Sequence, residues 1–146
     1  MTSFSFASFE TRPRTPREVA GWFDGVHPVV VVERAGVVAG FAATFTYRPR
    51  ECYAGVAEVS VYVARASRGL GVGREATEAI IAAAEAAGFR KLVSRVFPEN
   101  TVSRRLLHST GFREVGLYRR HARLEGAWRD VVIVERLLGE AARERR

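Results

Sequence analysis

Residues 58–74 combine an apolar strand, a glycine-rich turn and the start of a helix. The turn is bounded by arginines and reads Arg68-Gly-Leu-Gly-Val-Gly-Arg74. Glycine lets the backbone approach an anion closely, and the first N–H groups of a helix have no partners inside the helix, so they are free to bind that anion. The two arginines add positive charge. These residue types in this order predict a binding site for a phosphate-bearing cofactor.

Two other phosphate-binding motifs are weaker interpretations of the same turn. A P-loop requires lysine and then serine or threonine after its last glycine, whereas Gly73 is followed by Arg74 and Glu75. A dinucleotide-binding fingerprint fits residues 71–76, with Glu99 as its acidic partner. A dinucleotide fold begins with that motif, however, and three predicted strands precede it here. We therefore treat the dinucleotide site as the minor alternative.

A second motif follows at residues 100–112. It consists of Asn100-x-x-Ser103-x-x-Leu106 and then Gly111-Phe112. The glycine turn itself fits the pattern R/Q-x-x-G-x-G/A. With the two motifs in this order, the sequence resembles the GCN5-related N-acetyltransferase (GNAT) superfamily, and the resemblance implies N-acetyl transfer from acetyl-CoA to an amine.

Two further segments resemble one branch of that superfamily. Glu58–Val63 and Gly126–Asp130 are similar to the phosphinothricin acetyltransferase branch, and the similarity runs from about Phe9 to Leu137. The branch implies a small, anionic, amino-acid-like acceptor. The open alternatives are another primary amine, such as a protein N-terminus or an antibiotic, and a degenerate domain that binds coenzyme A without catalysis.

The resemblance also implies which residues hold coenzyme A. In the superfamily, the strand before the glycine turn separates from its neighbour, and backbone groups of residues 61–63 would bind the pantetheine arm in the gap and polarise the thioester carbonyl. The turn would bind the pyrophosphate, and the next helix would contribute Asn100 and Ser103. The implied set is Val61, Tyr62, Val63, Arg68, Gly69, Leu70, Gly71, Val72, Gly73, Arg74, Asn100 and Ser103.

On the acceptor side, Glu58 matches the position of the superfamily's general base. A carboxylate there would take a proton from the acceptor's ammonium, directly or through water. Strand alternation places Val56, Ser60 and Tyr62 on the same face as this glutamate. The alternative is a glutamate that faces solvent on a half-exposed strand.

Arg48 and Arg50 lie in the loop before this strand, where the branch places basic residues that hold the acid groups of the substrate. The planar guanidinium suits pairing with a carboxylate or a phosphinate. The alternative is that the two arginines are simply solvated on an exposed loop.

Three departures from the family pattern all concern the acceptor side. Leu107 occupies the position of the family's tyrosine or histidine, and His108 lies one residue later, about 100° around the helix. The group that protonates the leaving thiolate is therefore not identified. Gly55 stands where an aromatic residue is usual, and the family's first strand and first helix have no counterpart before Phe9.

The elements that must position these residues follow from hydrophobic periodicity and turn signals. The pattern predicts helices at residues 15–24, 73–87 and 100–109, and strands at residues 29–33, 37–47, 54–63, 92–97, 115–124 and 128–137. This order indicates an α/β layered domain. The family resemblance implies a mixed, mostly antiparallel sheet with helices on both faces. We expect one N-acetyltransferase domain over residues 1–138 and a charged, frayed tail at 139–146.

Composition agrees with a single globular domain. The chain has 146 residues, a net charge of +7 and one cysteine, Cys52, which excludes an intramolecular disulfide. We expect no metal site and, because the arginines are scattered through every segment, no nucleic-acid partner.

No apolar run approaches the roughly 20 residues of a membrane span. With no recognisable signal peptide, we expect a cytoplasmic protein with a small-molecule substrate. Since relatives are often dimers, a homodimer is a further expectation.

Overall fold

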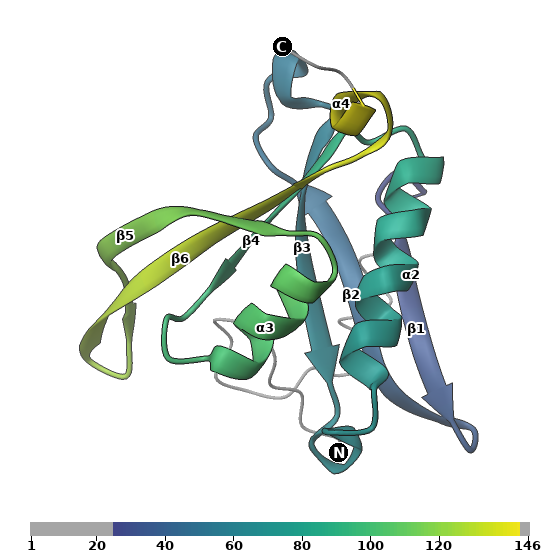
Figure 1. The fold of residues 1–146 in the computed structure, drawn as a ribbon, viewed down its shortest axis with the longest axis vertical. Helices are drawn as coiled ribbons and strands as arrows, with labels where there is room; N and C mark the ends of the chain where they lie inside the picture. Colours follow the sequence, from purple (N-terminus) through teal and green to yellow (C-terminus); the bar gives the residue numbers. More distant parts are fainter. Residues whose placement is uncertain (1–24, 144–146) are drawn as a thin grey trace.

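The computed structural model describes residues 25–143 and contains a six-stranded sheet with the order β1-β2-β3-β4-β6-β5. Strands β3 and β4 are parallel, and all other neighbours are antiparallel, so the predicted mixed, mostly antiparallel sheet is confirmed (Figure 1). In chain order the elements are β1 (Val29–Arg34), β2 (Val37–Thr46), β3 (Val56–Val63), α2 (Val72–Ala86), β4 (Lys91–Val96), α3 (Thr101–Ser109), β5 (Arg113–Leu124), β6 (Ala127–Leu137) and α4 (Gly139–Arg143), with short 3-10 helices at Glu51–Tyr53 and Arg65–Ser67.

The C-terminal segment differs from its prediction. Residues 139–143 form the short helix α4 rather than a frayed tail. Leu138 is fully buried just before it, and the N–H of Gly139 donates to Oε2 of Glu85 at 2.9 Å. These two anchors hold the start of the segment against α2. The helix predicted at residues 15–24 and the question of the family's first strand lie outside the described residues.

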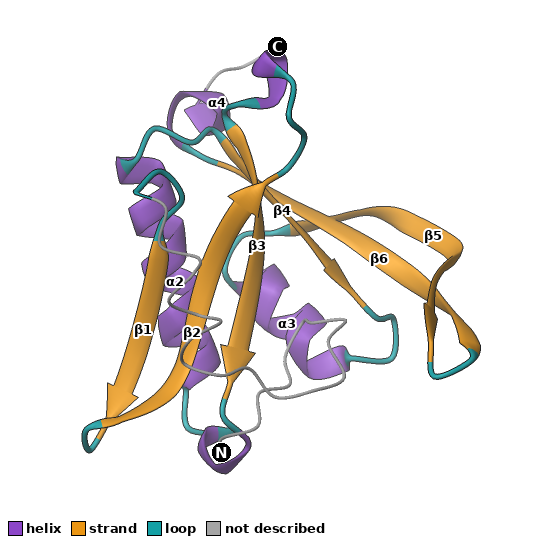
Figure 2. Ribbon diagram, turned by 180° about the vertical axis from the view of Figure 1, so that it is seen from behind, coloured by secondary structure: helices purple, strands orange, loops and turns teal. Residues whose placement is uncertain are grey.

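Helices α2 and α3 pack on one face of the sheet, in front of it in Figure 1 and behind it in Figure 2. Ala76, Ile80 and Ala84 are fully buried and recur every four residues, which places them on one side of α2. They join a hydrophobic core with Val59 and Val61 of β3. Helices on both faces were expected. Within the described residues, α2 and α3 account for only one of these faces.

Strands β3 and β4 separate soon after they meet. Their pairing covers Val56 with Lys91, Ala57 with Leu92, and Glu58 with Val93. Beyond that point β3 stays with β2 and β4 follows β6. Figure 2 shows the two halves of the sheet diverging, with α3 at the opening between them. Among residues 25–143, the last part of β3 therefore has no strand partner on the β4 side, as the family resemblance implies.

Gly40 of β2 sets how closely α2 approaches the sheet. A Cβ at this position would lie 2.6 Å from the carbonyl oxygen of Tyr62 and 2.7 Å from Cγ1 of Val72. Only glycine avoids this overlap. The first residue of α2 is thus pressed against the end of β3, which fixes the glycine turn between them.

Candidate active site

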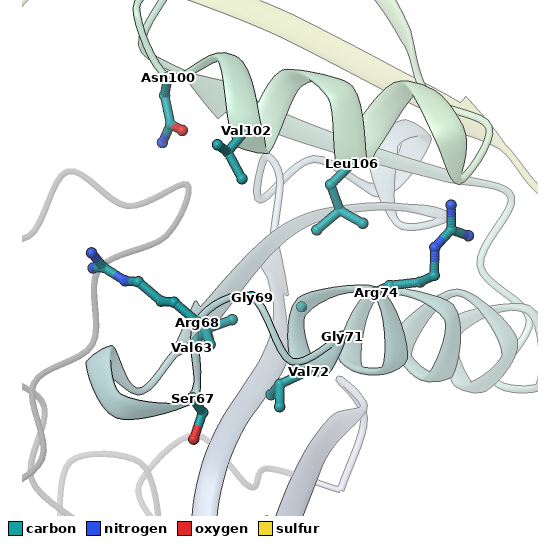
Figure 3. A pocket seen from close by; sticks show the side chains of 11 residues that line it. Val63, Ser67, Arg68, Gly69, Gly71, Val72, Arg74, Asn100, Val102 and Leu106 are labelled. Carbon is teal, nitrogen blue, oxygen red and sulfur yellow. The ribbon is translucent and has the colours of Figure 1, made fainter.

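A cleft of about 600 Å³ lies between the glycine turn and α3 (Figure 3). It collects most of the residues predicted to hold coenzyme A. Its lining consists of Val63, Ser67, Arg68, Gly69, Gly71, Val72, Gly73, Arg74, Asn100, Val102 and Leu106. Ser67, Val102 and Leu106 were not predicted as site residues, whereas Val61, Tyr62, Leu70 and Ser103 were predicted and are not part of the lining.

The glycine turn presents backbone donors to this cleft. Gly69 and Gly71 both have φ of +79°, a left-handed conformation that favours glycine. A Cβ at either position would meet nothing within 4 Å, so the backbone conformation, and not crowding, requires glycine there. Gly71 is the N-cap of α2, and the N–H groups of residues 72–74 have no partners within the helix. This helix start is suited to bind an anion.

The two arginines of the turn lie at opposite ends of the cleft (Figure 3). Arg74 donates to Oγ of Ser109 at 2.9 Å and forms an ion pair with Glu78 at 3.6 Å. It therefore links α2 to the end of α3. Arg68 extends on the side where Asn100 lies. Of the two, Arg68 is the better placed to meet a negatively charged group near the start of α3.

Helix α3 presents a different side to the cleft than its motif suggests. Oδ1 of Asn100 accepts from the N–H of Ser103 at 3.2 Å, so Asn100 caps the helix at the rim of the cleft. Ser103 itself is fully buried on the core side with Leu107. The cleft is lined instead by Val102 and Leu106. Their spacing of four residues, about 100° around the helix from the buried Ser103 and Leu107, is the sequence signal that could have identified them.

Along β3, the backbone N–H and C=O groups of successive residues point alternately toward the gap and toward β2. On the β4 side, the carbonyl of Val59 accepts from Oγ of Ser94 at 2.8 Å. On the β2 side, the N–H of Ala64 donates to the carbonyl of Ala39 at 2.7 Å. Backbone groups alternate in direction along a strand, so those of Val61 and Val63 face the gap and those of Tyr62 face β2.

The side chain of Tyr62 is also turned away from the cleft. It is buried and stacks on the ring of Phe41, with the ring centroids 4.6 Å apart. Of the three residues predicted to bind the pantetheine arm through their backbone, only Val61 and Val63 have backbone groups in position to do so.

Glu58 lies at the last β3–β4 pair before the strands separate, on the face opposite α2 and α3. Its Oε1 forms an ion pair with Nη2 of Arg95 at 3.0 Å, and the two side chains are 28% and 31% exposed. This partner was not predicted, because it comes from β4, on the far side of α2 in the sequence. The glutamate is therefore not freely solvated. It is a partly exposed member of a charge pair.

The loop with Arg48 and Arg50 lies at the opposite end of β3 from the glycine turn. The guanidinium of Arg48 sits 4.4 Å from the ring centroid of Tyr47 and donates to the carbonyl of that residue at 2.8 Å. Arg50 precedes the 3-10 helix Glu51–Tyr53 and is exposed. The structure places neither arginine in the cleft. A hollow of about 330 Å³ lies beside this loop, with Tyr47 and Tyr53 among its lining residues.

Two of the family departures now have a structural account. At Gly55, a Cβ would lie 2.9 Å from Nε of Arg90, whose Nη2 donates to the carbonyl of Cys52 at 2.8 Å. The arginine therefore fills the space that an aromatic side chain would need. Leu107 is a core residue, only 1% exposed, and His108 is exposed. No proton donor stands at the family position.

Residues 25–143 contain no group of three metal-ligating side chains. Within the same range, no helix has the length and apolar character needed to cross a bilayer.

Comparisons with known proteins agree with this geometry. The model of the acetyltransferase (GNAT) family matches residues 2–112. The phosphinothricin N-acetyltransferase of Alcaligenes faecalis is 36% identical over 137 residues, which are 90% of this chain and 70% of the relative. The L-methionine sulfoximine/L-methionine sulfone acetyltransferase of Salmonella typhimurium is 33% identical over 116 residues, which are 80% of this chain and 68% of the relative.

A solved structure extends the similarity to three dimensions. The GNAT superfamily phosphinothricin acetyltransferase from Sinorhizobium meliloti, in complex with AcCoA, superposes with a TM-score of 0.82 at 27% identity, covering 97% of this chain and 79% of the other. The chain therefore belongs to the acetyltransferase (GNAT) family, in its phosphinothricin acetyltransferase-like branch, and is an N-acetyltransferase that uses acetyl-CoA.

Proposed function

We propose that this enzyme acetylates the primary amine of a small, anionic, amino-acid-like acceptor, with Glu58 as the general base. The observation that carries the proposal is the arrangement around the point where β3 and β4 separate. The cleft lies at one end of the gap, and Glu58 stands on the opposite face of the sheet at its beginning. A donor and an acceptor could thus approach the gap from the two faces.

The residues present fit coenzyme A. The N–H groups at the start of α2 suit the pyrophosphate, and the left-handed Gly69 and Gly71 allow the backbone to approach it. The backbone groups of Val61 and Val63 face the gap and suit the amides of the pantetheine arm. Val102 and Leu106 give the cleft an apolar wall.

Acetyl-CoA supplies an acetyl group that is activated as a thioester. In the proposed reaction, Glu58 accepts a proton from the acceptor's ammonium, and the free amine forms the new N–C bond while the C–S bond breaks. The ammonium loses two protons in total, of which one ends on the departing sulfur and one in solvent. Because Leu107 cannot donate a proton, we propose that the sulfur receives its proton from water.

The choice of acceptor is supported by the relatives and by the charges near Glu58. The named relatives act on phosphinothricin and on L-methionine sulfoximine or sulfone. Arg48 and Arg50 are exposed near the start of β3 and suit a second acid group on the acceptor. We propose that they bind that distal group.

The test combines binding with turnover. Thermal stabilisation by acetyl-CoA measures whether the cleft binds the donor, and thiol release measures transfer to phosphinothricin, L-methionine sulfone, a peptide with a free N-terminus and an aminoglycoside. We expect stabilisation, with turnover of the first two acceptors. Stabilisation without turnover of any amine would identify a degenerate coenzyme A-binding domain. Preferential turnover of the peptide or the aminoglycoside would overturn the proposed acceptor class.

A further inference from the structure

The ion pair between Glu58 and Arg95 holds a cation beside the proposed base. The Nη2–Oε1 distance is 3.0 Å, and both side chains remain about one-third exposed. The β3–β4 register pairs Glu58 with Val93, so Arg95 lies two residues further along β4, at the start of the gap. The two charges therefore lie side by side where an acceptor has to arrive.

Other cations of this sheet have acidic partners other than the proposed base. Lys91 and Arg113 both form ion pairs with Glu135, and Arg129 forms one with Glu99. Among the ion pairs of residues 25–143, the cation that contacts Glu58 is Arg95. Arg95 is therefore the guanidinium that an anion next to the base would meet first.

The pair is complementary to the head of an α-amino acid. In such a molecule the ammonium nitrogen and the carboxylate oxygens are held about 3 Å apart by bond lengths. An amino acid can therefore place its ammonium against Glu58 and its carboxylate against Arg95 at the same time. An amine without an α-carboxylate satisfies only half of the pair and leaves Arg95 bound to the glutamate that must act as the base.

We infer that Arg95 binds the α-carboxylate of the acceptor while Glu58 takes the proton from its amine, so that selection for the α-carboxylate depends on Arg95. The inference rests on the proposed function and narrows it. It assigns the α-carboxylate to β4 and leaves the loop arginines for a second acid group. Arginine suits this role because its planar fork pairs with both oxygens of a carboxylate.

The test compares two acceptors that differ only in the α-carboxylate. These are L-methionine sulfone and 3-(methylsulfonyl)propan-1-amine. We expect the wild type to have a higher kcat/KM for the amino acid than for the amine. Arg95→Met should reduce the ratio of these two values, amino acid over amine, by about 10- to 100-fold, mainly by raising the KM of the amino acid. Arg95→Lys should restore part of the ratio, because it returns the charge without the fork.

Arg113→Met is the matched control, since it removes an arginine that pairs with Glu135 on the same sheet. It should leave the ratio unchanged, and thermal stabilisation by acetyl-CoA should be equal in all variants. If Arg95→Met slows both acceptors equally, Arg95 only positions Glu58 and the inference is overturned. An unchanged ratio also overturns it.

The two hypotheses fail in different ways. A wild type that acetylates both acceptors without preferring the amino acid contradicts the inference and leaves the proposed base intact. A wild type that acetylates neither contradicts the proposed function. In that case calorimetric binding of L-methionine sulfone in the presence of coenzyme A still tests Arg95, because binding that is lost in Arg95→Met supports the inference, and binding that is absent or unchanged overturns it.

Discussion

The donor side and the acceptor side of this site achieve recognition by different means. On the donor side the suitable groups are mostly backbone: the N–H groups that begin α2 and the free edge of β3 at Val61 and Val63. Side chains contribute less there, since Arg74 is tied to Ser109 and Leu70 is 65% exposed outside the cleft lining. The donor side thus depends on conformation, which a few glycines specify.

On the acceptor side the suitable groups are side chains that are held in pairs. Glu58 contacts Arg95, and Arg48 stacks on Tyr47. The side chains of both pairs are exposed or partly exposed. This difference explains how one fold can keep its donor while its acceptor varies. It also predicts that substitutions on the two sides will separate cleanly into effects on acetyl-CoA and effects on the amine.

The largest effect is expected from Glu58→Gln. This substitution keeps the shape of the side chain and removes its capacity to accept a proton, so we expect kcat to fall by about 10²- to 10⁴-fold. Thermal stabilisation by acetyl-CoA should not change, because the cleft does not include this residue. Steady-state thiol release at several pH values measures the loss. Turnover equal to the wild type would show that Glu58 is not the base.

A smaller effect, on the donor side alone, is expected from Gly71→Ala. The left-handed backbone at this N-cap costs an alanine roughly 1–2 kcal/mol, and relief of that strain would turn the first N–H groups of α2 away from the cleft. We expect the KM for acetyl-CoA to rise about tenfold, with the acceptor KM unchanged.

Gly88→Ala is the matched control for this change. Gly88 has φ of +92° at the opposite end of α2, and a Cβ there also meets nothing within 4 Å. We expect Gly88→Ala to lower the melting temperature about as much as Gly71→Ala does, without changing the KM for acetyl-CoA. Equal effects of the two variants on that KM would mean that α2 matters only for stability.

The next smaller effect is expected on the acceptor side, from substitutions of the two loop arginines. Arg48→Ala and Arg50→Ala should each raise the KM of phosphinothricin by about threefold to tenfold, because exposed arginines bind anions weakly. The KM for acetyl-CoA should stay constant. Arg123→Ala is the matched control, since that guanidinium lies over the ring of Trp128, 5.4 Å from its centroid. An unchanged phosphinothricin KM in both loop variants excludes the loop arginines from acceptor binding.

How much could be predicted from the sequence follows the same division. The glycine turn was readable because positive φ at Gly69 and Gly71 is a local requirement with a local residue preference. The six strands and the helices α2 and α3 lie within two residues of their predicted bounds, since turn residues and periodicity are also local signals, whereas the two short 3-10 helices were not predicted. The separation of β3 from β4 was predicted from the family resemblance and not from a local signal.

What could not be predicted depends on contacts between distant segments. Arg95 meets Glu58 only because of the β3–β4 register, and the strands are separated by all of α2. Ser103 faces the core and Val102 faces the cleft because of how α3 is rotated against the sheet, which its motif does not determine. Likewise, the start of α4 is held by a bond from Gly139 to Glu85, a residue 54 positions earlier in the sequence.

The smallest effect concerns the part of the sheet that supports the acceptor side. A hydrogen bond from Lys91, assisted by the charge of Arg113, holds the pKa of Glu135 below its ordinary value of 4.5 despite partial burial. The folded-state pKa is therefore lower than that of the unfolded chain. The carboxylate contributes stability that is fully present above about pH 4.5 and is lost as the pH falls through the folded-state value.

Lys91→Met removes the main cause of this shift. We expect the free energy of unfolding at pH 7 to fall by about 1 kcal/mol, and the difference from the wild type to shrink as the pH drops below about 4.5. Urea unfolding from pH 7 to pH 3 measures both. Lys91→Arg keeps the charge and should behave like the wild type. A difference that stays constant with pH would mean that Lys91 stabilises β4 by packing and not through the charge of Glu135.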